Sequence, residues 1–146
     1  MRKSKPLSKQ DASGESFVQE MLDGDPTYAI NFDRLQFDKI INKYVIFEFL
    51  LCEEEQLVSP YTSHPNRYWF KNARKFISLW EAAIKLEADL YLINYAKVGT
   101  KHENEVLAIK VLSVDENGIK KEIRKKFSRQ EFKTWFQNKN NNCASK

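Results

Sequence analysis

The apolar positions of the chain are most concentrated between residues 36 and 52. Two apolar runs, residues 36–41 and 44–52, flank the polar pair Asn42-Lys43. Both runs are rich in β-branched and aromatic residues, which favour strands, and a short polar break between such runs is typical of a tight turn. The pattern predicts a β-hairpin here, preceded by another strand over about residues 28–35.

The strongest helical pattern follows, over residues 67–87, with Asn66 as the expected N-cap. Apolar residues recur there at spacings of three, four and seven, which places them on one helix face. These residues are Trp69, Phe70, Ala73, Phe76, Ile77, Trp80, Ala83 and Ile84. We therefore expect Trp69 and Trp80 in the core and the charged residues of the segment on the opposite face.

Three further patterns complete the predicted order of elements. A short helix is expected over residues 15–22 with Ser13 as its cap, and a strand over residues 89–96. Residues 105–114 and 119–127 predict a hairpin turning at Asn117-Gly118. Ser128 and Glu131 form a capping box that opens a last helix, ending near residue 138. The order is α-β-β-β-α-β followed by β-β-α, an α+β class with a mixed sheet flanked by helices.

Length and composition predict one folded domain over residues 15–138, between disordered polar tails at 1–14 and 139–146. The chain has 146 residues, of which 42% are hydrophobic and 13% aromatic, enough for a core without disulfide or metal support. With no long apolar run or secretory leader, we expect no membrane partner and a cytoplasmic location. Two cysteines and two histidines provide neither a disulfide framework nor a zinc ligand set.

Charge is distributed unevenly along the chain. Residues 1–14 carry a net charge of +3, residues 119–146 carry +7, and the residues between them carry −6. Within that acidic middle, residues 56–80 contain no acid and four cations, namely Arg67, Lys71, Arg74 and Lys75. Basic surface beside an acidic hairpin suits a polyanionic partner such as nucleic acid, with a metal ion between the two. Ordinary solubility charge explains the same numbers equally well.

Two carboxylates interrupt the apolar hairpin, Asp38 in its first strand and Glu48 in its second. A buried, unpaired carboxylate is costly, so these acids need either solvent or a function. Together they could hold Mg²⁺, which prefers oxygen ligands. A two-residue turn would set Asp38 opposite Phe47, and only an odd-length loop or a bulge would bring it level with Glu48. We predict that loop or bulge. The simpler alternative is that both acids face solvent.

These residues and this order of elements resemble the PD-(D/E)xK nuclease superfamily, which has the restriction-endonuclease-like fold. The resemblance covers roughly residues 15–96, with Asp38 matching the aspartate of the motif and Glu48 its second acid. It implies a nuclease dependent on Mg²⁺ or Mn²⁺ that hydrolyses phosphodiester bonds, with DNA as the expected substrate and Asp38 and Glu48 as metal ligands. A homodimer is compatible with this function, because enzymes that cut duplexes often use two copies.

The motif lysine is missing, because its position is Leu50. Lys71 or Lys75 could reach in from the long helix, or Glu54 with Gln56 could form a variant motif. We favour Lys71 as the third catalytic residue, with the four cations of residues 56–80 binding the nucleic-acid backbone. Those cations could instead form a solvated helix face. Leu50 itself favours another function, that of a catalytically inactive module of the same fold that binds nucleic acid or a protein partner.

Overall fold

The computed structural model describes residues 12–144, so most of the basic tail at 1–14 and the last two residues lie outside the described part. Residues 31–144 form one compact unit, and residues 12–30 belong to another. The smaller unit contains helix α1 (Ser13–Leu22), which has no buried residue. Ser13 lies inside this helix and Ala12 is its N-cap, so the predicted capping role of Ser13 is wrong.

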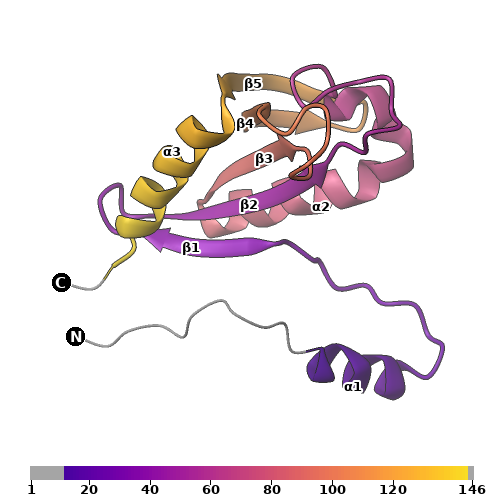
Figure 1. Cartoon of the computed structure of the whole chain (residues 1–146). Coiled ribbons are helices and arrows are strands. Elements are labelled where there is room, and N and C mark those ends of the chain that lie inside the picture. The colour runs from indigo at the N-terminus through magenta and orange to yellow at the C-terminus, as the bar shows by residue number, and fades with distance from the viewer. Residues whose placement is uncertain (1–11, 145–146) are drawn as a thin grey trace. The chain divides into compact units, whose positions relative to one another are not determined.

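A five-stranded mixed sheet organises the larger unit, in the order β1-β2-β3-β4-β5 (Figure 1). The strands are β1 (Arg34–Asp38), β2 (Lys43–Leu51), β3 (Asp89–Tyr95), β4 (Val106–Asp115) and β5 (Gly118–Phe127). Strands β2 and β3 are parallel, whereas the other neighbouring pairs are antiparallel. The predicted α+β class is confirmed. The expected strand over residues 28–35 is wrong, because only its last two residues join the sheet, and the N-terminal meander has two strands instead of three.

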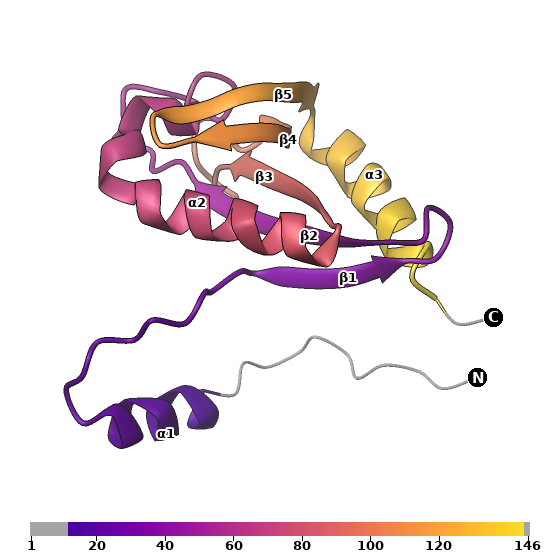
Figure 2. The same cartoon turned by 180° about the vertical axis from the view of Figure 1, so that it is seen from behind.

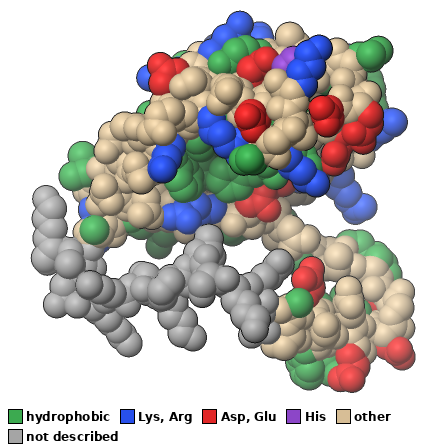
Figure 3. All heavy atoms as spheres, in the orientation of Figure 1, with side chains coloured by type: hydrophobic (Ala, Val, Ile, Leu, Met, Phe, Trp, Pro, Cys, Tyr) green, Lys and Arg blue, Asp and Glu red, His purple; other side chains and the backbone are tan. Residues whose placement is uncertain are grey.

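Helices cover both faces of the sheet, α2 (Trp69–Leu86) on one and α3 (Arg129–Asn141) on the other (Figures 1 and 2). Under α2 the core contains Ile46, Leu92 and Ile109, and under α3 it contains Val45 and Phe47. Because β2, β3 and β4 are covered on both faces, their sequences are apolar in nearly continuous runs. Beside α3, hydrophobic side chains gather in a hollow bordered by lysine and arginine side chains (Figure 3).

The predicted long helix is confirmed in place but not in its start. A short 3₁₀ turn, η1 (Pro65–Tyr68), is capped by the side chain of His64 and precedes α2. The side chain of Asn66 is not a cap; it pairs with both backbone groups of Ile119 on the edge strand β5. Trp69 is buried as expected, whereas Phe70 and Ile84, which were assigned to the apolar face, are exposed.

The C-terminal part follows the sequence pattern closely. Strands β4 and β5 turn at Glu116-Asn117, and Gly118, which begins β5 and pairs with Asp115, has a φ of 145°, a conformation that favours glycine. Ser128 and Glu131 form the predicted capping box at the start of α3. The helix continues to Asn141, so residues 139–141 are helical and the expected tail from residue 139 is wrong there.

Candidate functional site

The register of the β1–β2 hairpin decides where its two acids lie. Asp38 is paired with Lys43 across a four-residue turn, residues 39–42, in which Asn42 has a left-handed φ of 56°. The predicted odd-length loop or bulge between Asp38 and Glu48 is therefore wrong. Extending the Arg34–Phe47 pairing by one residue places Asp33, not Asp38, opposite Glu48.

As a result, Asp38 and Glu48 lie on opposite faces of the sheet. Asp38 is paired with Lys43 and lies on the same face as Val45 and Phe47, which pack under α3. Glu48 alternates with them and faces α2 together with Ile46. The two carboxylates cannot hold one metal ion, so the predicted Asp38–Glu48 metal site is wrong.

Asp38 has a complete set of structural contacts. It is fully buried, and its Oδ1 accepts hydrogen bonds from the backbone N–H groups of Ile40 and Ile41 at 2.9 and 3.2 Å. Its Oδ2 accepts a third bond from the Asn142 amide at 3.2 Å. Asp38 thus closes the hairpin turn and attaches the end of α3 to it, which leaves it no catalytic part.

Glu48 is also buried, but one of its two carboxylate oxygens lacks a hydrogen bond. The residue is 5% exposed, its Oε2 lies 2.6 Å from Lys75 Nζ, and its Oε1 has no hydrogen-bond partner. Burial raises the pKa of Glu48 above its usual value; the Lys75 ammonium lowers it, and Asp33 acts both ways, since its charge raises the pKa and its backbone N–H group lowers it. Buried polar atoms are normally hydrogen-bonded, so the unpartnered Oε1 needs an explanation, as do the three other such atoms among residues 12–144, on Asn94, Glu105 and Glu122.

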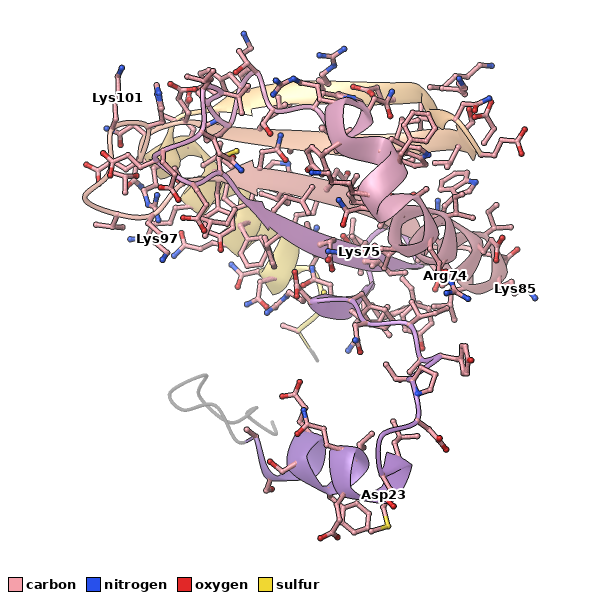
Figure 4. The ribbon with its side chains drawn as sticks, turned by 90° about the vertical axis from the view of Figure 1, so that its right-hand side faces the viewer. Asp23, Arg74, Lys75, Lys85, Lys97 and Lys101 are labelled. Carbon is pink, nitrogen blue, oxygen red and sulfur yellow. The ribbon has the colours of Figure 1, made fainter. Side chains whose placement is uncertain are left out.

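Asp33 and Lys75 complete what we call the Glu48 site, defined as Asp33, Glu48 and Lys75. Asp33 precedes β1, and its Oδ2 accepts a hydrogen bond from the Phe49 N–H at 2.8 Å, which holds it beside Glu48. Lys75 comes from α2 and lies over β2 (Figure 4). Its side chain is 44% exposed, so it connects the buried acid to solvent.

A cleft of about 760 Å³ begins at Lys75 and extends along the carboxyl ends of the parallel strands β2 and β3. Its lining includes Arg67, Lys71, Lys75, Tyr68, Gln56 and Asn94. Three of the four predicted nucleic-acid-binding cations therefore line it. The fourth, Arg74, does not, and Figure 4 shows it away from β2. Crevices at the carboxyl ends of parallel strands are the usual ligand sites of such sheets.

Lys71, the predicted third catalytic residue, lines the cleft but is not the lysine that pairs with Glu48. Lys71 is exposed on the cleft wall, whereas Lys75, one helical turn further along α2, contacts Glu48. Glu54 and Gln56, the variant motif, belong to the loop after β2, and Gln56 lines the cleft. Burial raises the pKa of the Tyr68 hydroxyl in the same wall to about 12.

Asp33 was not predicted, although the sequence is compatible with its place. Asparagine tolerates a left-handed φ at the end of a turn, so Asn42 is compatible with a longer, even-length hairpin loop as well as with the odd-length loop or bulge that we predicted. A four-residue loop sets Asp33 level with Glu48. The apolar pattern of the strands was the same for either register, so it could not distinguish them.

The described residues contain neither a metal cluster nor a membrane-spanning helix. Among residues 12–144, no three His, Cys, Asp or Glu side chains come together as a metal cluster. No helix in the same range is long and apolar enough to cross a membrane. Comparison with known protein families, with curated proteins and with solved structures found no match.

Proposed function

We propose that the chain is a metal-dependent nuclease of the PD-(D/E)xK type, acting on DNA at the Glu48 site. One observation carries the proposal: a nearly fully buried carboxylate, unpartnered at one oxygen, is paired through the other with Lys75, which lines a cleft together with Arg67 and Lys71. An acid and a lysine beside a cationic groove are the groups that phosphodiester hydrolysis requires.

The donor set fits a divalent ion that shares its coordination with the substrate. Mg²⁺ or Mn²⁺ takes oxygen ligands, and Mg²⁺ is commonly bound by one or two carboxylates together with substrate phosphates. Asp33 and Glu48 supply two carboxylates, and Glu48 Oε1 has no competing hydrogen bond. When bound, the ion would polarise the phosphate and acidify a water molecule.

The residues of the chain then have separate tasks. Glu48 and Asp33 would hold the ion, and Lys75 would hold the Glu48 carboxylate in place and neutralise charge that develops on the phosphate. Arg67 and Lys71 would bind backbone phosphates along the cleft. Compared with the resemblance in the sequence, Asp33 replaces Asp38, and Lys75 replaces both the missing motif lysine at Leu50 and the favoured Lys71.

A module that binds nucleic acid without cutting it is the second candidate function. Two observations favour it: Leu50 at the motif-lysine position, and no third acid near the pair within residues 12–144. Both functions use the same cleft, so they differ only in whether bonds are broken.

A plasmid-nicking assay separates them, with Mg²⁺ or EDTA, on wild type and Glu48→Gln. We expect cleavage by the wild type in Mg²⁺ only, and a loss of at least about 10²-fold in Glu48→Gln, because metal ligation contributes several kcal/mol. Glu81→Gln, which removes an exposed acid of α2, is the matched control and should cut normally.

Two results would contradict the nuclease. Unchanged cleavage by Glu48→Gln would assign the activity to another site or another protein. Salt-sensitive binding by a wild type that never cuts would identify the binding module.

A further inference from the structure

The cleft ends on a second buried polar atom that the nuclease chemistry does not use. Asn94 lies on β3, lines the cleft and is 1% exposed. Its Nδ2 donates hydrogen bonds to the backbone carbonyls of Pro60 and Ser63, at 3.2 and 2.5 Å. Because two carbonyl acceptors can only face the NH₂ end, they determine the orientation of the amide. The Oδ1 at the other end has no hydrogen-bond partner.

This oxygen is a buried acceptor on a residue that lines the cleft. A buried acceptor without a donor is rare in proteins and calls for one from outside. A ligand that forms a hydrogen bond with Asn94 Oδ1 must present an N–H or O–H group to it. The loop of residues 60–63 cannot supply that donor, because it contacts Asn94 through carbonyl groups at the opposite end of the amide.

The other residues that line the cleft restrict the chemical class of the ligand further. Half-buried Tyr68, Leu50 and Val58 line the cleft, together with exposed charged residues, which are the cations Arg67 and Lys71 and one acid, Glu55. A fitting ligand therefore has a largely apolar ring with a donor group at its inner end and negative charge at its outer end. A nucleotide combines these three properties, and a base can pack against an aromatic wall with little dependence on sequence.

We propose that the cleft accepts one unpaired nucleotide of a nucleic-acid strand, whose base donates a hydrogen bond to Asn94 Oδ1 while its phosphates lie along Arg67 and Lys71. In a duplex the Watson–Crick N–H groups are already used and the base is held in the stack. The substrate class of the proposed nuclease is then single-stranded or locally unpaired nucleic acid. This inference rests on the proposed function for its choice of ligand.

Binding in EDTA tests the inference without any cleavage. Fluorescence anisotropy would compare labelled oligo(dT) with a strand of N3-methylthymidine of the same length, and with the oligo(dT)·oligo(dA) duplex. Methylation removes the only N–H donor of thymine and leaves charge and ring in place. We expect the methylated strand and the duplex each to bind at least about tenfold more weakly than oligo(dT). Equal affinity for the methylated strand, or for the duplex, overturns the proposal.

A cleft-filling variant supplies a second measurement. Val58→Trp should reduce the preference for oligo(dT) over its methylated form while keeping the salt dependence of binding, because the phosphate contacts of Arg67 and Lys71 remain. Val98→Trp places the same side chain at an exposed loop position outside the cleft lining and should behave as wild type. Discrimination that persists in a folded Val58→Trp protein would place the base elsewhere.

The outcomes for cleavage and for binding are independent. Discrimination against N3-methylation by a protein that never cuts in Mg²⁺ would support the nucleotide cleft and reject the nuclease. Cleavage of duplex DNA by a protein that binds the methylated and unmethylated strands equally would support the nuclease and reject the nucleotide cleft.

Discussion

Asp38 and Glu48 are buried carboxylates on one hairpin, yet their surroundings differ completely. Asp38 accepts hydrogen bonds from Ile40, Ile41 and Asn142, all within a turn and a helix end that it holds together. Glu48 forms an ion pair with Lys75 and has an oxygen without a hydrogen-bond partner. The contacts of Asp38 explain its burial through folding. The contacts of Glu48 do not, and that difference is our reason for proposing Glu48, and not Asp38, as the functional acid.

The difference also follows from energy. Removing a carboxylate that satisfies buried N–H groups leaves those groups unpaired, which costs more than the bonds themselves. A buried ion pair is often neutral or unfavourable for stability, because desolvation offsets the attraction between its charges. A carboxylate kept in that condition is therefore better explained by binding than by folding, as are many acids with perturbed pKa values in clefts.

The largest expected effect is on stability. Asp38→Ala should lower the free energy of unfolding by about 3 kcal/mol, since it leaves the N–H groups of the turn without an acceptor. Glu48→Gln should change it by less than about 1 kcal/mol, because it removes a buried charge and keeps the shape. Urea denaturation measures both. A Glu48→Gln loss as large as that of Asp38→Ala would make Glu48 a structural residue and end the comparison.

Asp33→Asn tests whether the acid beside Glu48 contributes to cleavage. The variant keeps an oxygen that can accept the Phe49 N–H bond but loses the charge beside Glu48, so nicking should fall by roughly 10²-fold without loss of folding. Asp115→Asn is the matched control, because Asp115 also accepts a backbone bond, from Asn117 at 2.7 Å, but at the distant β4–β5 turn. Equal activity of the two variants would remove Asp33 from the site.

A smaller effect distinguishes two lysines on one helix. Lys75→Met should lower kcat, because Lys75 contacts Glu48, whereas Lys71→Met should mainly raise KM, because Lys71 only lines the cleft. We expect each change to be about tenfold, which steady-state cleavage of a labelled oligonucleotide can resolve. The opposite assignment, with kcat depending on Lys71, would restore the residue favoured from the sequence.

The smallest effect is a dependence of stability on pH. The pKa of Glu48 is raised in the folded protein above its ordinary value of 4.5, so between these two values the folded state binds more protons than the unfolded state. The wild type should therefore lose stability relative to Glu48→Gln as pH rises through that window. Cleavage should rise through the same window as the carboxylate ionises. Parallel stability curves for the two proteins would show that Glu48 titrates normally.

Much of the fold was accessible from the sequence because the signals that carry it are local. The apolar stripe of α2, the β4–β5 turn and the capping box at Ser128 each depend on residues within a few positions of one another. The strand expected over residues 28–35 failed because a short apolar stretch does not specify whether the sheet will accept it.

The site depended on a quantity that no local pattern contains, namely the register between β1 and β2. A strand exposes alternate side chains on opposite faces, so a one-residue shift in register would put Asp38 on the face of Glu48, and only a five-residue shift would set it in the place of Asp33. Which lysine of α2 reaches that acid, and which carbonyls orient Asn94, depends on how helix and loop pack on the sheet. The sequence alone determined that acids and cations would gather around this hairpin, and tertiary packing decided which of them meet, because contacts between distant segments depend on geometry that accumulates over the whole fold.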